Sequence, residues 1–283
     1  MPFLLAVSLL WAFSFGLIKG RLAGLDSAFI SAVRLGFALL VFLPFLRWAG
    51  LTFRVAGALL GIGAAQFGLM YLAYNESFRH LQAHEVALFT LTTPVWVTLV
   101  ADVWQRTFRP RALVAALVAL AGAGVAMLPA SALQPTLLGF ALVQASSLAF
   151  AFGQVAYREL RRRHPELRDA AIFALPCAGG FALALLALAV QPDLARPEVT
   201  GAQWLTLAYL GVLASGLGFF LWNVGVTRVG AGTAAVMNNA KIPLGIACSL
   251  VFFGESADLP RLLLSFSCLA LAVWLASPRN QEG

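Results

Sequence analysis

The chain has 283 residues, of which 61% are hydrophobic and only 11% charged, and its mean hydropathy is +0.87. A soluble domain carries roughly a quarter charged residues, so this composition excludes an ordinary soluble domain and indicates an integral membrane protein. The net charge of +7 comes from residues in short gaps between apolar runs, which favours a membrane over a nucleic acid as the partner. The three cysteines lie inside apolar segments without pairing or metal spacing, and they predict neither a disulfide nor a metal site.

Ten apolar runs follow one another along the chain. A helix needs about 20 apolar residues to cross a hydrocarbon core of about 30 Å. The runs that meet this length cover residues 3–20, 26–46, 55–77, 82–101, 111–129, 135–157, 169–190, 202–226, 232–253 and 260–276. We therefore expect an all-α integral membrane protein of ten transmembrane helices. No basic segment precedes the first run, so we interpret that run as a retained helix and not as a signal peptide.

The distribution of Arg and Lys predicts the orientation. With the N-terminus inside, most basic residues fall in inner loops, above all in the stretch 158–168, and few fall in outer loops. Both termini are then cytoplasmic. The chain has 17 Arg and 2 Lys residues, a bias typical of GC-rich bacterial genomes, which predicts a multi-pass protein of a bacterial inner membrane.

The two halves of the chain, 1–130 and 131–283, share collinear patterns. Residues 12–16 and 149–153 both read Ala-Phe-x-Phe-Gly, residues 36–39 and 180–183 both read Gly-Phe-Ala-Leu, and the dipeptide Pro-Arg recurs at 110–111 and 260–261. Five helices per half place the second half upside down relative to the first. Such inverted repeats are typical of secondary transporters, which bind substrate near the membrane midplane between the halves.

Lys241 is the deepest lysine, about 13 Å along the ninth run at 1.5 Å per residue. A charge at that depth is costly, so we expect Lys241 to face a central cavity and to bind an anionic group of the substrate. Asn238 and Asn239 would join it beside the turn that Pro243 weakens. The alternatives are that Lys241 binds backbone carbonyls or is deprotonated, and that the two amides only hold helices together.

Three further residues are candidates for coupling or gating. His84 and Glu85 open the fourth run near the outer face, and Arg34 lies about seven residues into the second run from the same side. One interpretation is that His84 or Glu85 takes up a proton and couples its flow to transport. The other is a structural ion pair between Arg34 and Glu85.

Aromatic and amide residues inside the runs form the remaining candidates. We expect the following to contact substrate: Trp11, Phe15, Tyr74, Trp222 and Asn223. Aromatic residues in membranes also serve as core or interface anchors, which is the alternative. No nucleophile–base set, phosphate-binding loop or metal-ligand motif is present, so the sequence predicts no enzyme and no cofactor.

The chain resembles the EamA family of the drug/metabolite transporter (DMT) superfamily. The resemblance rests on Trp11-x-x-Ser14-Phe15-x-x-x-Lys19, on Arg34, on the stretch 74–94, and on later matches at Asn223, 230–234, Pro243 and 254–255. It implies two inverted EamA-like repeats around a central cavity that opens alternately to each side. The first half lacks the Gly-Glu expected after its fourth helix, where Asp102 is the nearest acid.

These observations together predict a secondary active transporter that exports small organic metabolites such as amino acids or carboxylates. The expected partners are a small-molecule substrate, the lipid bilayer and a coupling proton, with no nucleic acid, in a monomer or homodimer. Alternatives are an exchanger of phosphorylated sugars or nucleotide sugars, and a membrane scaffold that transports nothing.

Overall fold

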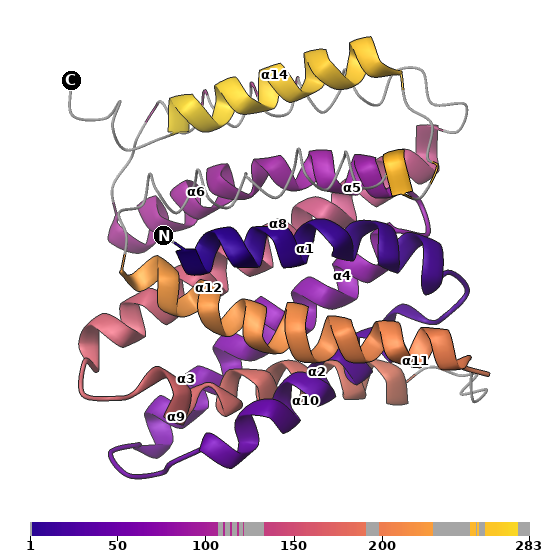
Figure 1. Cartoon of the computed structure of the whole chain (residues 1–283). Helices are drawn as coiled ribbons and strands as arrows, with labels where there is room; N and C mark the ends of the chain where they lie inside the picture. Colours follow the sequence, from indigo (N-terminus) through magenta and orange to yellow (C-terminus); the bar gives the residue numbers. More distant parts are fainter. Residues whose placement is uncertain are drawn as a thin grey trace.

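The computed structural model describes residues 2–106, 133–190, 198–228 and 258–276, with isolated positions at 110, 114, 118, 121, 250–252 and 254. All regular structure in these ranges is helical, and the helices lie side by side in one bundle (Figure 1). The first half contains α1 (Pro2–Arg21), α2 (Ser27–Phe42), η1 (Leu43–Phe45), α3 (Phe53–Gly63), η2 (Ala64–Leu69), α4 (Met70–Ser77), α5 (Ala83–Phe89), η3 (Thr90–Thr92) and α6 (Thr93–Gln105). The second half contains α8 (Leu133–Arg163), α9 (Asp169–Ile172), α10 (Ala174–Ala189), α11 (Gly201–Ala208), η4 (Tyr209–Leu217), α12 (Gly218–Thr227) and α14 (Leu259–Ala276).

Within the described ranges, six helical segments are long and apolar enough to cross a membrane. They are Ser27–Phe45, Phe53–Ser77, Ala83–Gln105, Thr136–Arg163, Asp169–Ala189 and Gly201–Thr227. Each corresponds to a predicted apolar run, although the fourth run continues to Gln105 and the sixth to Arg163. The first and tenth runs form α1 and α14, and the runs 111–129 and 232–253 lie almost wholly outside the described residues.

Polar side chains define where several helices begin. Asp26 caps α2 by accepting hydrogen bonds from the amides of Ala28 and Phe29 at 2.8 and 2.9 Å. Thr52 caps α3 in the same way through the amide of Val55, at 3.3 Å. These short polar residues satisfy amides that have no partner inside a first helical turn, so the loops between apolar runs fix the helix starts.

Two of the long segments contain a π-helical stretch near their middle. In the third predicted run it is η2, between α3 and α4, and in the eighth it is η4, between α11 and α12. The neighbours of these segments are arranged alike: η2 packs on α10 and α4 on α8, while η4 packs on α2 and α12 on α1. Helices α2 and α10 pack on each other.

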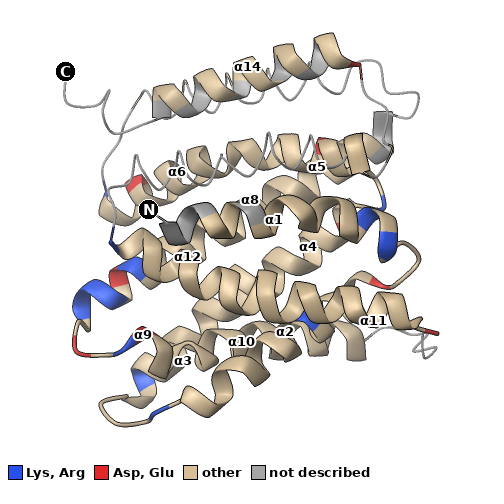
Figure 2. Cartoon of the chain, in the orientation of Figure 1, with Lys and Arg blue, Asp and Glu red and all other residues tan. Residues whose placement is uncertain are grey.

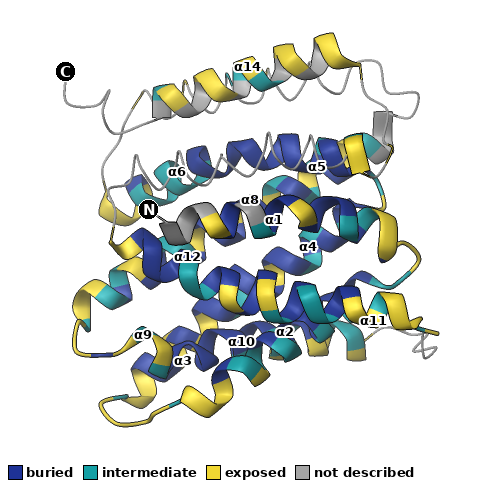
Figure 3. Ribbon diagram, viewed as in Figure 1, coloured by how far each residue is buried: buried dark blue, intermediate teal, exposed yellow. Residues whose placement is uncertain are grey.

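Glycines allow α3 and α10 to approach closely. A Cβ atom on Gly63 would lie 1.9 Å from the carbonyl oxygen of Pro176, and one on Gly179 would lie 1.9 Å from that of Leu60. Backbones of α3 and α10 therefore touch directly, as small residues permit in membrane helix pairs. Buried residues fill the centre of the bundle and exposed apolar ones, such as Leu263 and Trp274 of α14, face outward (Figure 3).

Charged residues concentrate at the ends of the bundle. Most of the described Lys and Arg residues lie at the end where α3 begins and α8 finishes (Figure 2). There Arg161 forms an ion pair with Asp169 at 2.8 Å, which ties α8 to α9. At the opposite end, Lys19 donates to the carbonyls of Phe78 and Leu81 at 2.7 and 2.9 Å, next to the C-terminus of α4.

Candidate functional site

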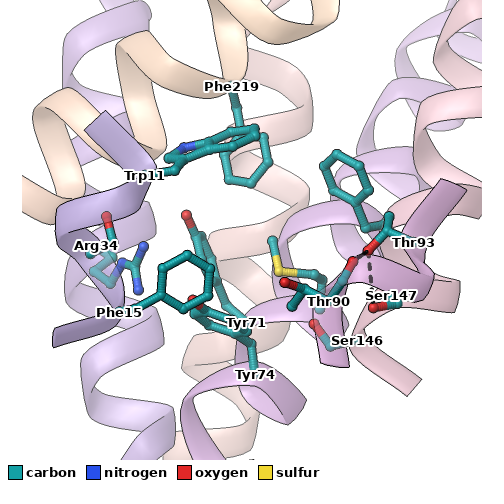
Figure 4. Close-up of a pocket in the computed structure, with 13 residues that line it drawn as sticks. Trp11, Phe15, Arg34, Tyr71, Tyr74, Thr90, Thr93, Ser146, Ser147 and Phe219 are labelled. Atoms are coloured by element: carbon teal, nitrogen blue, oxygen red, sulfur yellow. Dashed lines mark hydrogen bonds between the residues drawn. The ribbon is translucent and has the colours of Figure 1, made fainter. Parts of the chain in front are cut away.

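A cavity lies inside the bundle, between α1, α2, α4, α8, α12 and the junction of η3 with α6 (Figure 4). The space that protein atoms leave unoccupied is about 560 Å³, and this volume includes the solvent at the opening of the cavity. Its lining has three parts: a cation on α2, aromatic walls from four helices, and a set of hydroxyl groups on η3, α6 and α8. No described residue of the lining is acidic.

Arg34 supplies the cation. Its side chain is 2% exposed, its Nε lies 3.3 Å from Ser215 Oγ, and its Nη1 lies 3.3 Å from Asn75 Oδ1. The guanidinium carbon sits 4.0 Å from the centroid of the Tyr71 ring, a cation–π geometry. Within the described residues no carboxylate forms an ion pair with Arg34, so neutral groups alone hold this buried charge.

The neutral groups around Arg34 are themselves fixed by hydrogen bonds. The Tyr71 hydroxyl lies 2.8 Å from Ser215 Oγ, and Asn75 donates to Ser31 Oγ at 2.8 Å. Ser215 donates to the carbonyl of Leu210 five residues earlier, at 2.7 Å, inside the π-helical stretch η4. The π-helix thereby places Ser215 beside the guanidinium, consistent with the frequent occurrence of π-helical turns at functional sites. The cation is oriented before any ligand arrives.

Aromatic rings form the walls on either side of Arg34. Trp11 donates from Nε1 to the carbonyl of Ala214 at 2.9 Å and packs on Phe219 with ring centroids 5.1 Å apart. Phe15 and Tyr74 pack edge to face at 6.2 Å. Such rings bind apolar and planar ligand groups with little loss of conformational freedom.

Hydroxyl groups line the side of the cavity opposite Arg34, as Figure 4 shows. They belong to Thr90, Thr93, Ser146 and Ser147, all of which are buried. The cavity is therefore cationic at one end, aromatic along its length and neutral but polar at the other end.

The residues predicted from the sequence, other than His84, Glu85 and Asn223, fall into three groups. Trp11, Phe15, Tyr74 and Arg34 line the cavity. Trp222 lies behind its wall, where its ring packs at a tilt on Trp11 with centroids 5.3 Å apart and its Nε1 donates to Gln154 Oε1 at 3.2 Å. Lys241, Asn238 and Asn239 lie outside the described residues.

The residues proposed for coupling do not form the predicted pair. Glu85 accepts a hydrogen bond from the backbone amide of Gln82 at 2.8 Å, at the first turn of α5, while Arg34 binds Ser215 and Asn75. The alternative of an Arg34–Glu85 ion pair is therefore wrong, because the helix start uses the carboxylate locally. His84 is buried next to Glu85.

Sequence reasoning missed the hydroxyl groups and Ser215. Thr90 and Thr93 are three residues apart and so share a helix face, and Ser146-Ser147 stands in a run without charge. That spacing is a weak signal, because threonines elsewhere also bond their own helix: Thr206 donates to the carbonyl of Ala202 at 2.9 Å.

Asn223 is fully buried away from this cavity and accepts a hydrogen bond from Gln66 Nε2 at 3.2 Å. The bond links η2 to α12, and it leaves Gln66 Oε1 and Asn223 Nδ2 without partners among the described residues. A pair of substitutions can show whether this contact is structural.

We expect Gln66→Leu alone to lower the free energy of unfolding by about 1–3 kcal/mol, because the Asn223 amide loses its partner. The double change Gln66→Leu with Asn223→Leu is expected to cost less than the sum of the single changes, since it also removes the two unpaired atoms. Thermal unfolding of the purified variants measures this cycle. Additive losses would show that the two amides are not coupled.

A bundle of long apolar helices around a cavity with polar ends defines the class as a multi-pass membrane protein with an internal cavity. A model of the EamA-like transporter family matches residues 1–128 and 137–277. The chain belongs to the EamA-like transporter family, within the DMT superfamily. It is therefore a membrane transporter and not an enzyme. Family membership confirms the prediction of a transporter and the prediction that the chain is not an enzyme.

Curated relatives cover nearly the whole chain. A protein of Pseudomonas aeruginosa described as "Probable biotin transporter" is 42% identical over 97% of this chain and 96% of its own length. Proteins described as "Biotin transporter" are 36% identical in Salmonella typhimurium and 35% in Escherichia coli, each over 100% of this chain and 96% of the relative. A solved crystal structure covers 99% of this chain and 98% of its own with a TM-score of 0.68 at 18% identity, a likeness of fold alone.

Proposed function

We propose that this chain is a secondary active transporter of biotin in a bacterial inner membrane. The observation that carries the proposal is the buried Arg34, which has no carboxylate partner among the described residues and stands at one end of an aromatic cavity. Bacterial relatives that match the full chain are described as biotin transporters, which supports the same substrate.

The chemistry of biotin matches the order of groups in the cavity. Biotin carries a carboxylate at the end of a four-carbon chain, and the chain leads to a fused thiolane and cyclic urea. A carboxylate is the ligand that a buried guanidinium recognises best, because it accepts two parallel hydrogen bonds. The apolar chain and ring would lie against Trp11, Phe15 and Phe219.

We propose biotin as the substrate in place of the amino acids that the sequence analysis predicts. An amino acid carries an ammonium group beside its carboxylate, and a buried ammonium needs an acidic partner. The described lining contains no acidic residue. Phosphorylated sugars carry two negative charges and fit a cavity with a single described cation less well. We retain the prediction that Lys241, with Asn238 and Asn239, forms a second contact with the anionic group of the substrate in the ninth run.

The ten-helix inverted repeat with halves 1–130 and 131–283 is the architecture we propose for alternating access. The recurring neighbours of the two π-helical stretches support it, since η2 of the first half packs on α10 of the second, and η4 of the second half packs on α2 of the first. The basic end of the bundle supports cytoplasmic termini. Export, proton coupling through His84 or Glu85, and a monomer or homodimer remain predictions.

Purified protein in proteoliposomes is expected to transport radiolabelled biotin with saturable kinetics. Unlabelled biotin in excess should block this transport, whereas neutral amino acids and sugar phosphates at the same concentration should not, because they lack the matching groups. Empty liposomes give the background. Transport of amino acids with no transport or binding of biotin would contradict the proposal.

A further inference from the structure

The hydroxyl groups opposite Arg34 form a compact polar wall. Thr90 and Thr93 come from the junction of η3 and α6, and Ser146 and Ser147 come from α8, which packs on α6 (Figure 4). Each side chain is more than nine-tenths buried. Four buried hydroxyl groups on one wall of the cavity, beyond its aromatic residues, require hydrogen-bond partners.

The two threonine hydroxyl groups are acceptors toward the cavity. Thr90 Oγ1 donates to the carbonyl of Ala87 at 2.7 Å, and Thr93 Oγ1 donates to the carbonyl of Thr90 at 2.7 Å. A hydroxyl has one proton and two lone pairs. Because the short bonds to the helix carbonyls use both protons, the oxygens offer lone pairs to a ligand that donates N–H groups. Thr93 Oγ1 also lies 3.2 Å from Ser147 Oγ, a longer contact than its 2.7 Å bond to the Thr90 carbonyl.

Ser146 differs from its neighbours because its hydroxyl is uncommitted. Its side chain is 4% exposed and lines the cavity, and it makes no hydrogen bond within the described part of the chain. A serine in a membrane helix usually donates to a carbonyl of the preceding turn, as Ser14 does to Leu10 at 3.2 Å. The Ser146 proton is therefore available to a carbonyl group in the cavity.

We propose that this wall is the recognition site for the cyclic urea of the substrate and sets the specificity of the transporter. The urea N–H groups donate to Thr90 Oγ1 and Thr93 Oγ1, and the urea carbonyl accepts from Ser146. With the carboxylate on Arg34 and the apolar ring between the aromatic walls, the order of groups along the ligand follows the order along the cavity. This inference rests on the proposed function.

Recognition by the wall has a consequence for selectivity. A carboxylic acid of the same length without a urea would bury the three hydroxyl groups without restoring their lost hydrogen bonds to water. Sites built to hydrogen-bond a substrate reject analogues that lack the bonding group far more strongly than apolar pockets reject a missing methylene. The wall thus separates biotin from lipoate, which carries the same pentanoate chain on a sulfur ring.

The test compares three ligands on three variants. The variants are Ser146→Ala, the double change Thr90→Val with Thr93→Val, and the control Thr98→Val, which removes a hydroxyl of α6 that donates to Pro94 at 3.0 Å outside the cavity. Valine preserves the volume of threonine. The ligands are biotin, dethiobiotin, which keeps the urea and the carboxylate, and lipoate, and the readout is the equilibrium Kd on purified protein.

We expect Ser146→Ala and the double threonine variant each to weaken biotin and dethiobiotin about tenfold or more, with lipoate affinity and thermal unfolding unchanged. Thr98→Val should bind all three ligands like the wild type. Equal losses for biotin and lipoate, or no loss for biotin, would overturn the urea site while leaving the transporter proposal intact. A wild-type protein that binds no biotin would overturn the proposed function itself.

Discussion

Replacing Arg34 with Gln is expected to weaken biotin binding at least about 100-fold and to abolish transport. The substitution removes the cation that faces the carboxylate, and the carboxylate would then be buried without a partner. Arg34→Lys should restore only part of the affinity, because an ammonium cannot donate two parallel hydrogen bonds. The measurements are equilibrium binding and proteoliposome transport.

The fold should survive this change. Arg34 is buried among neutral groups, so its removal deletes a buried charge that no described carboxylate neutralises. Thermal unfolding of Arg34→Gln is expected at or above the wild-type temperature. Arg79→Gln is the matched control, since Arg79 is an exposed arginine paired with Glu76 at 3.2 Å, and it should bind biotin normally. If Arg34→Gln bound biotin with wild-type affinity, the claim that Arg34 binds the substrate carboxylate would be contradicted.

Replacing Gly63 with Ala is expected to destabilise the bundle by about 1–3 kcal/mol, because the new Cβ would lie 1.9 Å from the carbonyl oxygen of Pro176. Neither atom belongs to a flexible side chain, so α3 and α10 must separate. These helices hold η2 and α2 in place, and the change should therefore also weaken ligand binding.

Gly61→Ala is the control for this contact. Gly61 is in the same helix, and a Cβ atom added to it would meet no neighbouring atom within 4 Å, so alanine there should leave stability unchanged or raise it slightly. Thermal unfolding in detergent distinguishes the two variants. Equal unfolding temperatures would show that the backbones of α3 and α10 are not in close contact.

Hydropathy predicted the six described segments that are long and apolar enough to cross a membrane, because burial in lipid demands long apolar runs whatever their neighbours are. It did not predict η2 or η4, since a π-helical stretch depends on contacts with helices far along the chain. The partners of Arg34 illustrate the same limit: Asn75 and Ser215 are 41 and 181 positions away, and sequence spacing suggested Glu85 instead.

Part of the site was nevertheless predictable. Trp11, Phe15 and Tyr74 were predicted to contact substrate as aromatic residues inside the apolar runs, and all three line this cavity. Trp222 and Asn223, an aromatic and an amide residue inside the runs, were predicted in the same way but bond to Gln154 and Gln66, a difference that only tertiary structure reveals. Thr90, Thr93, Ser146 and Ser147 were missed because small hydroxyl residues are common in membrane helices, where most bond their own backbone.

Competition by biotin methyl ester tests the central claim, that Arg34 holds the substrate carboxylate, most directly. The ester keeps the ring and the urea but lacks the negative charge. On the wild-type protein it is expected to displace radiolabelled biotin at least about tenfold less effectively than free biotin, and on Arg34→Gln, at ligand concentrations high enough to detect binding, the two should become equivalent. Equal displacement by acid and ester on the wild-type protein would contradict the assignment of the carboxylate to Arg34.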